Sequence, residues 1–183
     1  MLNRANKVAM TEAVAALAPT PGATVADVGF GGGLGLDLLL GAVGADGHVV
    51  GIDRSRTAIA RAARARRQQL EDGRLTLHET SILVLPLADG ALDGAITINT
   101  IYFIEELDRA LAELARVTAP SGRLVIGLGD PDAMAKERVV QHGFRLRPVP
   151  EVIETAAGAG FTLQDRRRTG TGKDAMHLLI LRT

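Results

Sequence analysis

The chain has 183 residues, the length of a single ordinary domain. Hydrophobic residues make up 46% and charged residues 23%, a composition typical of a folded globular protein. The 21 basic and 21 acidic residues give zero formal net charge, so no global charge attracts the chain to nucleic acid or to an anionic membrane. The absence of cysteine excludes a disulfide framework and any thiolate ligand, and it suits the reducing cytoplasm in which we expect the protein to act.

The first half of the chain alternates helical and strand patterns. Arg4 and Lys7 precede an apolar stretch over 8–18, but Thr11 and Glu12 interrupt it, which favours an amphipathic helix over a signal peptide. No apolar run approaches the ~20 residues of a membrane span. The expected elements that follow are a strand at Thr24–Val28, a helix at Leu34–Val43, a strand at His48–Ile52, a helix at Thr57–Glu71 and a strand at Leu75–His78.

The second half continues the alternation and then changes. We expect a strand at Leu92–Ile98, a helix at Glu105–Val117, a turn at 120–122, a strand at Leu124–Leu128, a short helix near 133–139, a helix from Pro150 to Ala157, and strands at Phe161–Arg167 and Met176–Leu181. Strands alternating with helices predict βαβ units, a parallel sheet and right-handed crossovers. The last two strands predict an antiparallel pair. The expected fold is therefore one α/β domain over 1–183, doubly wound, with 1–22 as an N-terminal helical cover.

A glycine-rich loop carries the strongest functional signal. Asp27 is the penultimate residue of a predicted strand, and Gly29, Gly31 and Gly33 follow before a predicted helix. Glycines let the backbone turn sharply and approach a ligand closely, while the helix start offers free N–H groups. At the carboxyl ends of parallel strands, this arrangement binds nucleotide-like cofactors.

The spacing of these glycines distinguishes between cofactors. The dinucleotide fingerprint G-x-G-x-x-G fails in every register, because Leu34, Leu36 or Leu38 occupies the third glycine position. The D-x-G-x-G-x-G run instead resembles the first motif of class I S-adenosylmethionine-dependent methyltransferases. The resemblance implies S-adenosylmethionine as the cofactor and methyl transfer by in-line displacement.

Asp53 is the second cofactor-binding candidate. It follows the second strand, twenty-odd residues beyond the glycines, where a carboxylate accepts hydrogen bonds from ribose hydroxyls; Arg54 beside it belongs to the same predicted site. The alternative is that Asp53 caps the next helix.

The resemblance covers most of the chain. The segments Leu85–Asp93 and Leu111–Leu124 are similar to those around the family's fourth and fifth strands, and the family's seven-stranded, Rossmann-like, mostly parallel sheet also ends in an antiparallel pair. Two departures concern the pocket. Ser81 stands where the family often has an acid for the adenine amino group, with Ile82 beside it to pack on the ring, and Phe30 stands where a small residue is common.

The acceptor side is less clearly marked. The end of the fourth strand is expected to face the methyl group, with Asn99 binding the cofactor or the acceptor and Tyr102 and Phe103 lining the acceptor pocket or simply packing in the core. The irregular segment 130–148 is the expected substrate loop or lid, and its His142 is a candidate general base. Together with Phe30 and Ile101, these aromatics favour a small, largely apolar acceptor.

The sequence also bears on several functions other than methyl transfer. The four histidines are scattered, and Asp130 and Asp132 lack a partner acid on the fourth strand, so no metal site is predicted. The arginines over 56–67 and 166–168 fit a solvated surface better than nucleic-acid binding. A non-catalytic S-adenosylmethionine-binding regulator and, less favourably, an NAD-linked oxidoreductase remain as alternatives.

Overall fold

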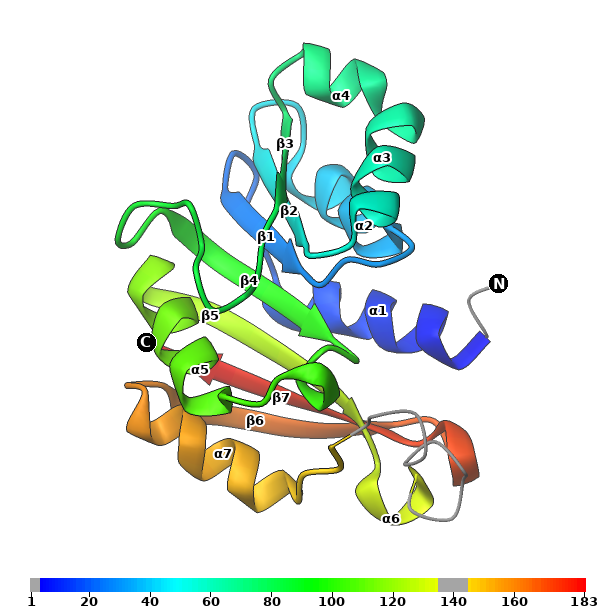
Figure 1. Ribbon diagram of the computed structural model, residues 1–183, viewed down its shortest axis with the longest axis vertical. Helices are drawn as coiled ribbons and strands as arrows, with labels where there is room; N and C mark the ends of the chain where they lie inside the picture. The colour runs from blue at the N-terminus through cyan, green and yellow to red at the C-terminus, as the bar shows by residue number, and fades with distance from the viewer. Residues whose placement is uncertain (1–3, 135–144) are drawn as a thin grey trace.

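The computed structural model describes residues 4–134 and 145–183, which form a single seven-stranded sheet (Figure 1). The strands are β1 (Thr24–Val28), β2 (His48–Asp53), β3 (Leu75–Glu79), β4 (Leu92–Ile98), β5 (Thr118–Gly129), β6 (Thr162–Thr169) and β7 (Met176–Arg182). Their order is β3-β2-β1-β4-β5-β7-β6. The first five run parallel, and β7 pairs antiparallel with both β5 and β6, which confirms the predicted closing pair.

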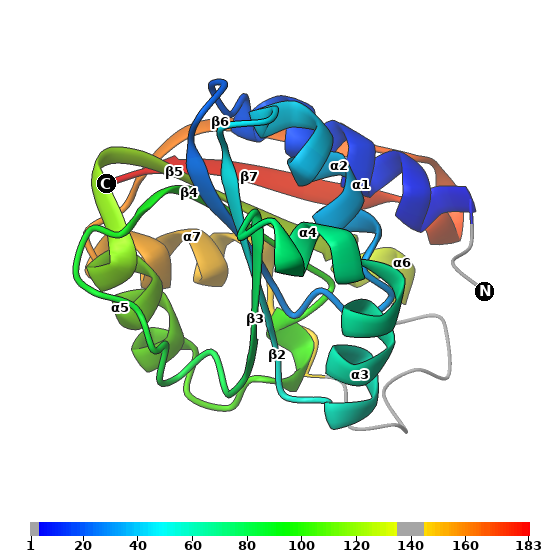
Figure 2. The same cartoon turned by 90° about the horizontal axis from the view of Figure 1, so that it is seen from above.

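Helices cover both faces of this sheet, as Figure 2 shows from above. The described helices are α1 (Arg4–Leu17), α2 (Leu34–Val43), α3 (Arg56–Ala65), α4 (Arg67–Glu71), α5 (Leu107–Val117), α6 (Pro131–Met134) and α7 (Val149–Gly158), with short 3-10 turns at η1 (Ile101–Phe103) and η3 (Gly172–Asp174). One face carries α1, α2 and α3, and the other carries α5 and α7. The doubly wound architecture predicted from the alternating pattern is therefore confirmed.

The central strands are apolar on both sides because both of their faces are covered. In β4, for example, Ala95 and Ile96 are both fully buried, one in the core under α5 and α7 and the other in the core under α1 and α2. Among the described residues, no helix has the length and apolarity that crossing a bilayer demands.

The predicted helix Thr57–Glu71 is wrong in one respect, because the chain breaks it into α3 and α4 at Arg66. Arg66 adopts φ −125° and ψ 37°, outside the helical region. This kink turns the Arg66 side chain inward, where it is almost fully buried. A helical pattern of apolar residues cannot predict a break that depends on contacts with distant residues.

Other boundaries shift less. β5 begins at Thr118 and passes through the predicted turn, with Ser121 at φ 65°, so the strand is much longer than 124–128. Helix α5 begins at Leu107 and not at Glu105, because Glu106 has the non-helical backbone of the N-cap, with φ −92° and ψ 70°. Of the helix expected near 133–139, α6 covers only 131–134, and residues 135–139 lie outside the described part.

Candidate functional site

A cavity of about 680 Å³ opens at the carboxyl ends of β1, β2 and β4. This is the edge of a parallel sheet where ligands bind in doubly wound folds, and the volume falls within the roughly 300–1,000 Å³ of small-molecule sites. Its lining comes from α1, the loop after β1, the ends of β2 and β4, the segment after β3, and η1 with the residues that follow it. The lining residues are Met10, Val28–Gly32, Ile52–Arg54, Thr80–Leu83, Ile98–Thr100 and Phe103–Glu106.

The glycine loop forms one wall, and its conformation requires glycine. Gly29, Gly31 and Gly33 have φ of 80°, 49° and 81°, in the left-handed region where a Cβ is strained. A Cβ on Gly29 would also overlap the side chain of Thr100, whose hydroxyl donates to the Val28 carbonyl at 3.3 Å. The loop is therefore packed directly against the end of β4.

Arg66, which does not line the cavity, binds the end of the same loop. Its Nη2 donates to the Gly33 carbonyl at 2.5 Å and to Asp37 Oδ2 at 2.8 Å, and its Nε donates to Asp37 Oδ1 at 2.8 Å. A Cβ on Gly33 would lie within 3.0 Å of the guanidinium. The kink between α3 and α4 thus places a cation where it fixes the last glycine of the loop.

Asp53 links the glycine loop to β2. Its Oδ2 accepts from the Gly31 N–H at 2.8 Å, and its Oδ1 accepts from the Ser55 N–H at 2.8 Å. The cap of α3 is Ser55, whose hydroxyl accepts from Ala58 N at 3.3 Å, so the alternative reading of Asp53 as the helix cap is wrong. Each carboxylate oxygen keeps a lone pair for a further donor. Arg54 lies beside Asp53 in the cavity lining.

Asp27 lies under the glycine loop rather than on the cavity surface. It is fully buried, and within the described ranges neither of its carboxylate oxygens has a hydrogen-bond partner. A Cβ on Gly35 would overlap this carboxylate, so the start of α2 packs directly on it. Burial, reinforced by the charge of Asp53 and opposed by that of Arg66, raises the pKa of Asp27 to about 7.

The opposite wall is the segment after β3. Ser81 and Ile82 both line the cavity, where the sequence predicted them, together with Thr80 and Leu83. The Ser81 hydroxyl accepts from the Leu83 N–H at 3.2 Å, so its own hydrogen is available to a further acceptor. No carboxylate belongs to this part of the lining.

The end of β4 separates two residues that the sequence grouped together. Asn99, at φ 58°, lines the cavity. Tyr102 is only 2% exposed, its hydroxyl donates to Asn99 Oδ1 at 3.3 Å and accepts from the Gly129 N–H, and its ring is not part of the lining. Burial raises the Tyr102 pKa to about 12. The aromatic pair is edge-on, and Phe103, about half exposed, is the member that reaches the cavity.

The predicted pocket residues are therefore only partly together. Phe30 lines the cavity but is otherwise buried in the core under α2, and Ile101 is buried outside the lining. His142 and Phe144 lie outside the described residues, as does most of the expected lid 130–148. The described end of that segment is docked: Arg145 N donates to the Tyr102 carbonyl at 3.0 Å, and the Arg145 side chain pairs with Glu105.

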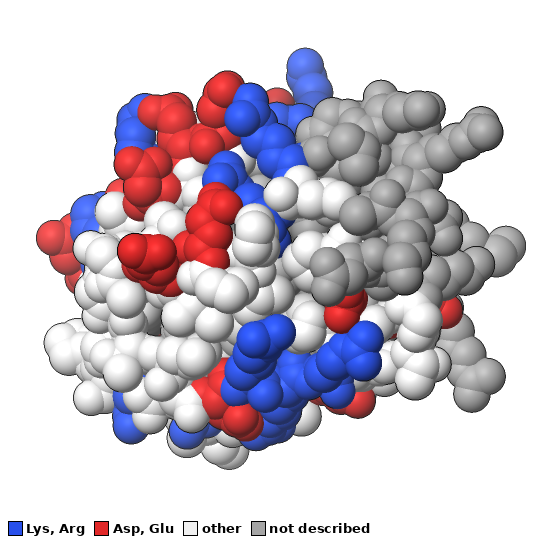
Figure 3. All heavy atoms as spheres, turned by 90° about the horizontal axis from the view of Figure 1, so that it is seen from below, with Lys and Arg blue, Asp and Glu red and all other residues white. Residues whose placement is uncertain are grey.

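The acids after β5 pair with neighbouring cations. Asp130 Oδ2 lies 3.1 Å from Arg168 Nη2 and 3.3 Å from His177 Nε2. The described residues hold no group of three His, Cys, Asp or Glu arranged to bind a metal ion. On the face drawn in Figure 3, basic side chains lie among acidic ones. On β6, Arg167 pairs with Asp165 at 2.8 Å.

Some lining residues had no clear sequence signal. Met10 reaches the cavity from α1, which packs beside the glycine loop, and Thr100, Glu105 and Glu106 follow Asn99. The position of Thr100 immediately after the predicted β4 end was a usable signal. That of Met10 was not, because a methionine in an amphipathic helix normally packs in the core.

The chain has relatives among known proteins. Residues 26–126 match the family model described as a methyltransferase domain. The chain is 39% identical over 119 residues to an uncharacterised 37.1 kDa protein in transposon Tn4556 of Streptomyces fradiae, and 34% identical over 126 residues to an O-methyltransferase of Pyrenophora dematioidea. Each alignment covers 65% of this chain but only 34% and 46% of the respective relative, so the chain spans less than half of the length of these curated relatives.

A solved structure shows the same fold. The S-adenosylmethionine-dependent methyltransferase from Mesorhizobium loti superposes with a TM-score of 0.79, over 96% of this chain and 98% of that chain, at 19% sequence identity. At this identity the likeness concerns the fold alone.

Proposed function

This chain belongs to the methyltransferase-domain family, and from that premise we propose that it transfers a methyl group from S-adenosylmethionine to a small-molecule acceptor. The observation that carries the proposal is the pairing of Asp53 with the Gly31 N–H at the edge of the cavity. It brings an acid and a glycine-rich backbone together at the carboxyl ends of β1 and β2, where doubly wound folds bind ribose-containing cofactors.

The residues present fit S-adenosylmethionine. Asp53 supplies acceptors for the ribose hydroxyls, and the glycine loop lets backbone approach the ligand without Cβ atoms. Ser81 and Ile82 offer a hydroxyl and an apolar side chain to the purine. Asp27 is fully buried and outside the cavity lining, so it belongs to the proposed site as the acid that supports the glycine loop from beneath and not as a direct contact of the cofactor.

When bound, the cofactor supplies a methyl group activated by its sulfonium charge, so the protein's contribution is position and electrostatics. Asn99 lines the cavity at the end of β4 and is held by Tyr102, which makes Asn99 the residue to orient the acceptor or the methionine end. Phe103 adds an apolar surface to the same side. Holding the reactants in line accounts for roughly 7–11 kcal/mol of barrier lowering in well-oriented reactions.

Two further properties of this chain belong to the proposal. The domain works as one unit over 1–183, with α1 covering the cavity through Met10. The cysteine-free composition supports a cytoplasmic location.

The proposal is tested by binding and by transfer. Calorimetry should show micromolar affinity for S-adenosylmethionine and S-adenosylhomocysteine and none for NAD. A screen of small hydroxyl, amine and thiol compounds with methyl-labelled cofactor should then transfer label to one class. Binding of NAD alone would contradict the cofactor, and tight cofactor binding with no transfer to any class would favour the non-catalytic regulator.

A further inference from the structure

The segment between β3 and β4 is a compact turn with no helix or strand of its own. The Thr80 hydroxyl donates to the Val84 carbonyl at 2.9 Å, and the Val84 N–H donates to the Ser81 carbonyl at 3.1 Å. With the bond between Leu83 N and the Ser81 hydroxyl, these contacts close residues 80–84 on themselves. These bonds fix the internal shape of the turn, so its position depends on how its two ends are attached.

The two ends are attached to different parts of the molecule. At the start, Thr80 N donates to the Asp53 carbonyl at 3.2 Å, which continues the pairing of β3 with β2. At the far end, Leu85 N donates to Glu113 Oε1 at 2.7 Å, and Arg116 Nη2 donates to the Leu85 carbonyl at 3.1 Å. The second attachment comes from α5, which lies on the face of the sheet opposite α1, α2 and α3.

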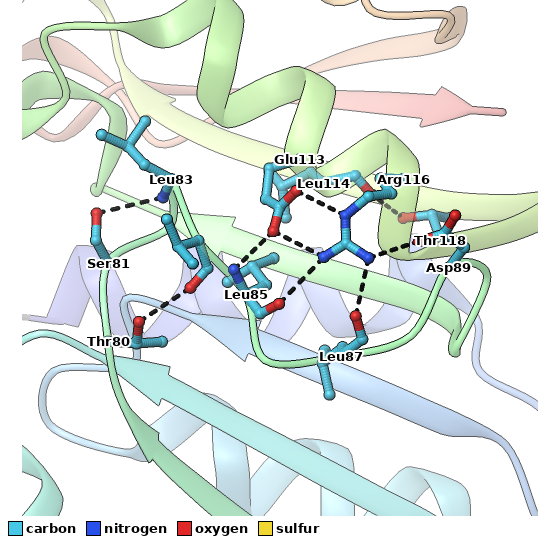
Figure 4. A network of polar contacts seen from close by, with 11 residues as sticks. Thr80, Ser81, Leu83, Leu85, Leu87, Asp89, Glu113, Leu114, Arg116 and Thr118 are labelled. Carbon is cyan, nitrogen blue, oxygen red and sulfur yellow. Dashed lines mark hydrogen bonds and ion pairs between the residues drawn. The ribbon is translucent and has the colours of Figure 1, made fainter.

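Arg116 is the centre of this attachment, as Figure 4 shows. Its Nε and Nη2 bind the Glu113 carboxylate, each at 2.8 Å. Its Nη1 donates to the Leu87 carbonyl at 2.9 Å and to Asp89 Oδ1 at 2.7 Å. Only a guanidinium offers a planar array of donors that satisfies a carboxylate and separate carbonyls together.

The environment keeps this contact charged and ordered. The side chains of Arg116 and Glu113 are 34% and 16% exposed, and the bond from Arg116 lowers the pKa of Glu113 below its usual value. Leu85 is 3% exposed in the core. Neither Glu113 nor Arg116 lines the cavity, whereas Thr80–Leu83 do.

We infer that Arg116 and Glu113 are positioning residues that fix the Ser81–Leu83 wall and thereby set the affinity of the cavity for the adenosyl part of its ligand. The affinity part of this inference rests on the proposed function. The positional part does not, because it concerns contacts between residues of the chain alone.

The test compares Arg116→Met and Arg116→Lys with Arg67→Met. Arg67 also pairs with a glutamate in its own helix, Glu71 at 2.7 Å, but its side chain is 82% exposed and does not line the cavity. Amide hydrogen exchange is measured on the ligand-free proteins, and S-adenosylhomocysteine affinity by calorimetry. The Gly31 amide, bonded to Asp53, serves as the internal reference.

For Arg116→Met we expect the Leu85 amide to exchange at least about tenfold faster with the Gly31 amide unchanged, and the S-adenosylhomocysteine Kd to rise about tenfold, because Glu113 loses its partner and two carbonyls lose their donor. Arg116→Lys should show smaller increases in the Leu85 exchange rate and in the S-adenosylhomocysteine Kd. If Arg116→Met fails to fold, the same comparison is made with Arg116→Lys alone. Arg67→Met should match wild type.

Unchanged exchange at Leu85 in a folded Arg116 variant would overturn the positional inference. Faster exchange at Leu85 with unchanged affinity would overturn its link to the ligand. If the wild type itself binds no S-adenosylhomocysteine, the proposed function fails, and the exchange measurement still decides whether Arg116 fixes the turn.

Discussion

The two walls of the cavity are held in contrasting ways. The glycine loop needs glycine at its own positions, since Gly29, Gly31 and Gly33 all have positive φ, and Arg66 adds a contact only at its last glycine. The turn at 80–84 has no glycine and depends on an arginine about thirty residues further along the chain, Arg116 being 31 positions from the Leu85 carbonyl that it binds. The conformation of one wall thus depends on glycines that tolerate positive φ, and the position of the other depends on a side chain of α5. Substitutions should therefore damage the two walls by different routes.

The largest effect is expected from Gly29→Ala. The new Cβ would be strained at φ 80° and would overlap Thr100, so we expect a loss of roughly 2–4 kcal/mol of stability and at least about 100-fold in S-adenosylhomocysteine affinity. The control is Gly41→Ala in α2, where nothing lies within 4 Å of the added Cβ. Urea unfolding and calorimetry check both variants. If Gly29→Ala bound S-adenosylhomocysteine as tightly as the control, the loop would not require glycine at this position.

Next in size is Asp53→Asn, which removes the charge but keeps one acceptor oxygen for the Gly31 or Ser55 N–H. Losing a charge-assisted acceptor should weaken S-adenosylhomocysteine binding by about 30-fold, or roughly 2 kcal/mol, while the fold persists. Asp46→Asn, in an exposed turn, is the matched change. Equal affinities of the two variants, measured by calorimetry, would remove Asp53 from the cofactor site.

The neighbouring arginines 66 and 67 separate a buried contact from a surface pair. Arg66→Met leaves Asp37 and the Gly33 carbonyl without their donor, and we expect a loss of about 1–2 kcal/mol of stability and a roughly fivefold weaker S-adenosylhomocysteine affinity. Arg67→Met removes an exposed pair worth at most about 0.5 kcal/mol. Matching urea midpoints for the two variants would argue against the Arg66 contact.

The smallest effect is a pH dependence that differs in sign between the walls. Because burial raises the Asp27 pKa to about 7, the folded protein retains a proton that the unfolded chain has released, and stability falls as the pH rises toward that value. Between about pH 6 and pH 7 we expect a loss of roughly 1 kcal/mol that Asp27→Asn does not show. Glu113 has the opposite effect on stability, because the hydrogen bond from Arg116 lowers its pKa below the usual 4.5. The stability that ionised Glu113 contributes is present above that value and is lost as the pH falls below it.

Urea unfolding of wild type and Asp27→Asn across this range measures the first effect. Parallel pH profiles of the two proteins would contradict a protonated, buried Asp27. Glu113→Gln provides the corresponding comparison on the acid side.

The contrast between the walls also explains what the sequence could predict. The glycine loop, Asp53 and the alternation of strands and helices are local patterns, so short stretches of chain were enough to predict the doubly wound fold and to propose this half of the candidate site. The break at Arg66 and the contact of Arg116 with Leu85 are tertiary events between distant segments, and periodicity contains no information on them.

Proximity in the sequence was a poor guide to which residues line the cavity at the end of β4. Asn99, Tyr102 and Phe103 lie within five positions, but η1 rotates them, so that Asn99 and Phe103 line the cavity while Tyr102 turns to Gly129 on β5. A strand end followed by a 3-10 turn distributes consecutive side chains over different directions, which a pattern of residue types does not reveal.

In the proposed function, one cavity between these two walls binds the cofactor. The most direct test is the titration of isotope-labelled protein with S-adenosylhomocysteine, followed through its backbone amide resonances. We expect shifts at both the Gly29–Gly32 and the Ser81–Leu83 amides, with α7 unaffected. Shifts confined to one wall, or located elsewhere, would contradict it.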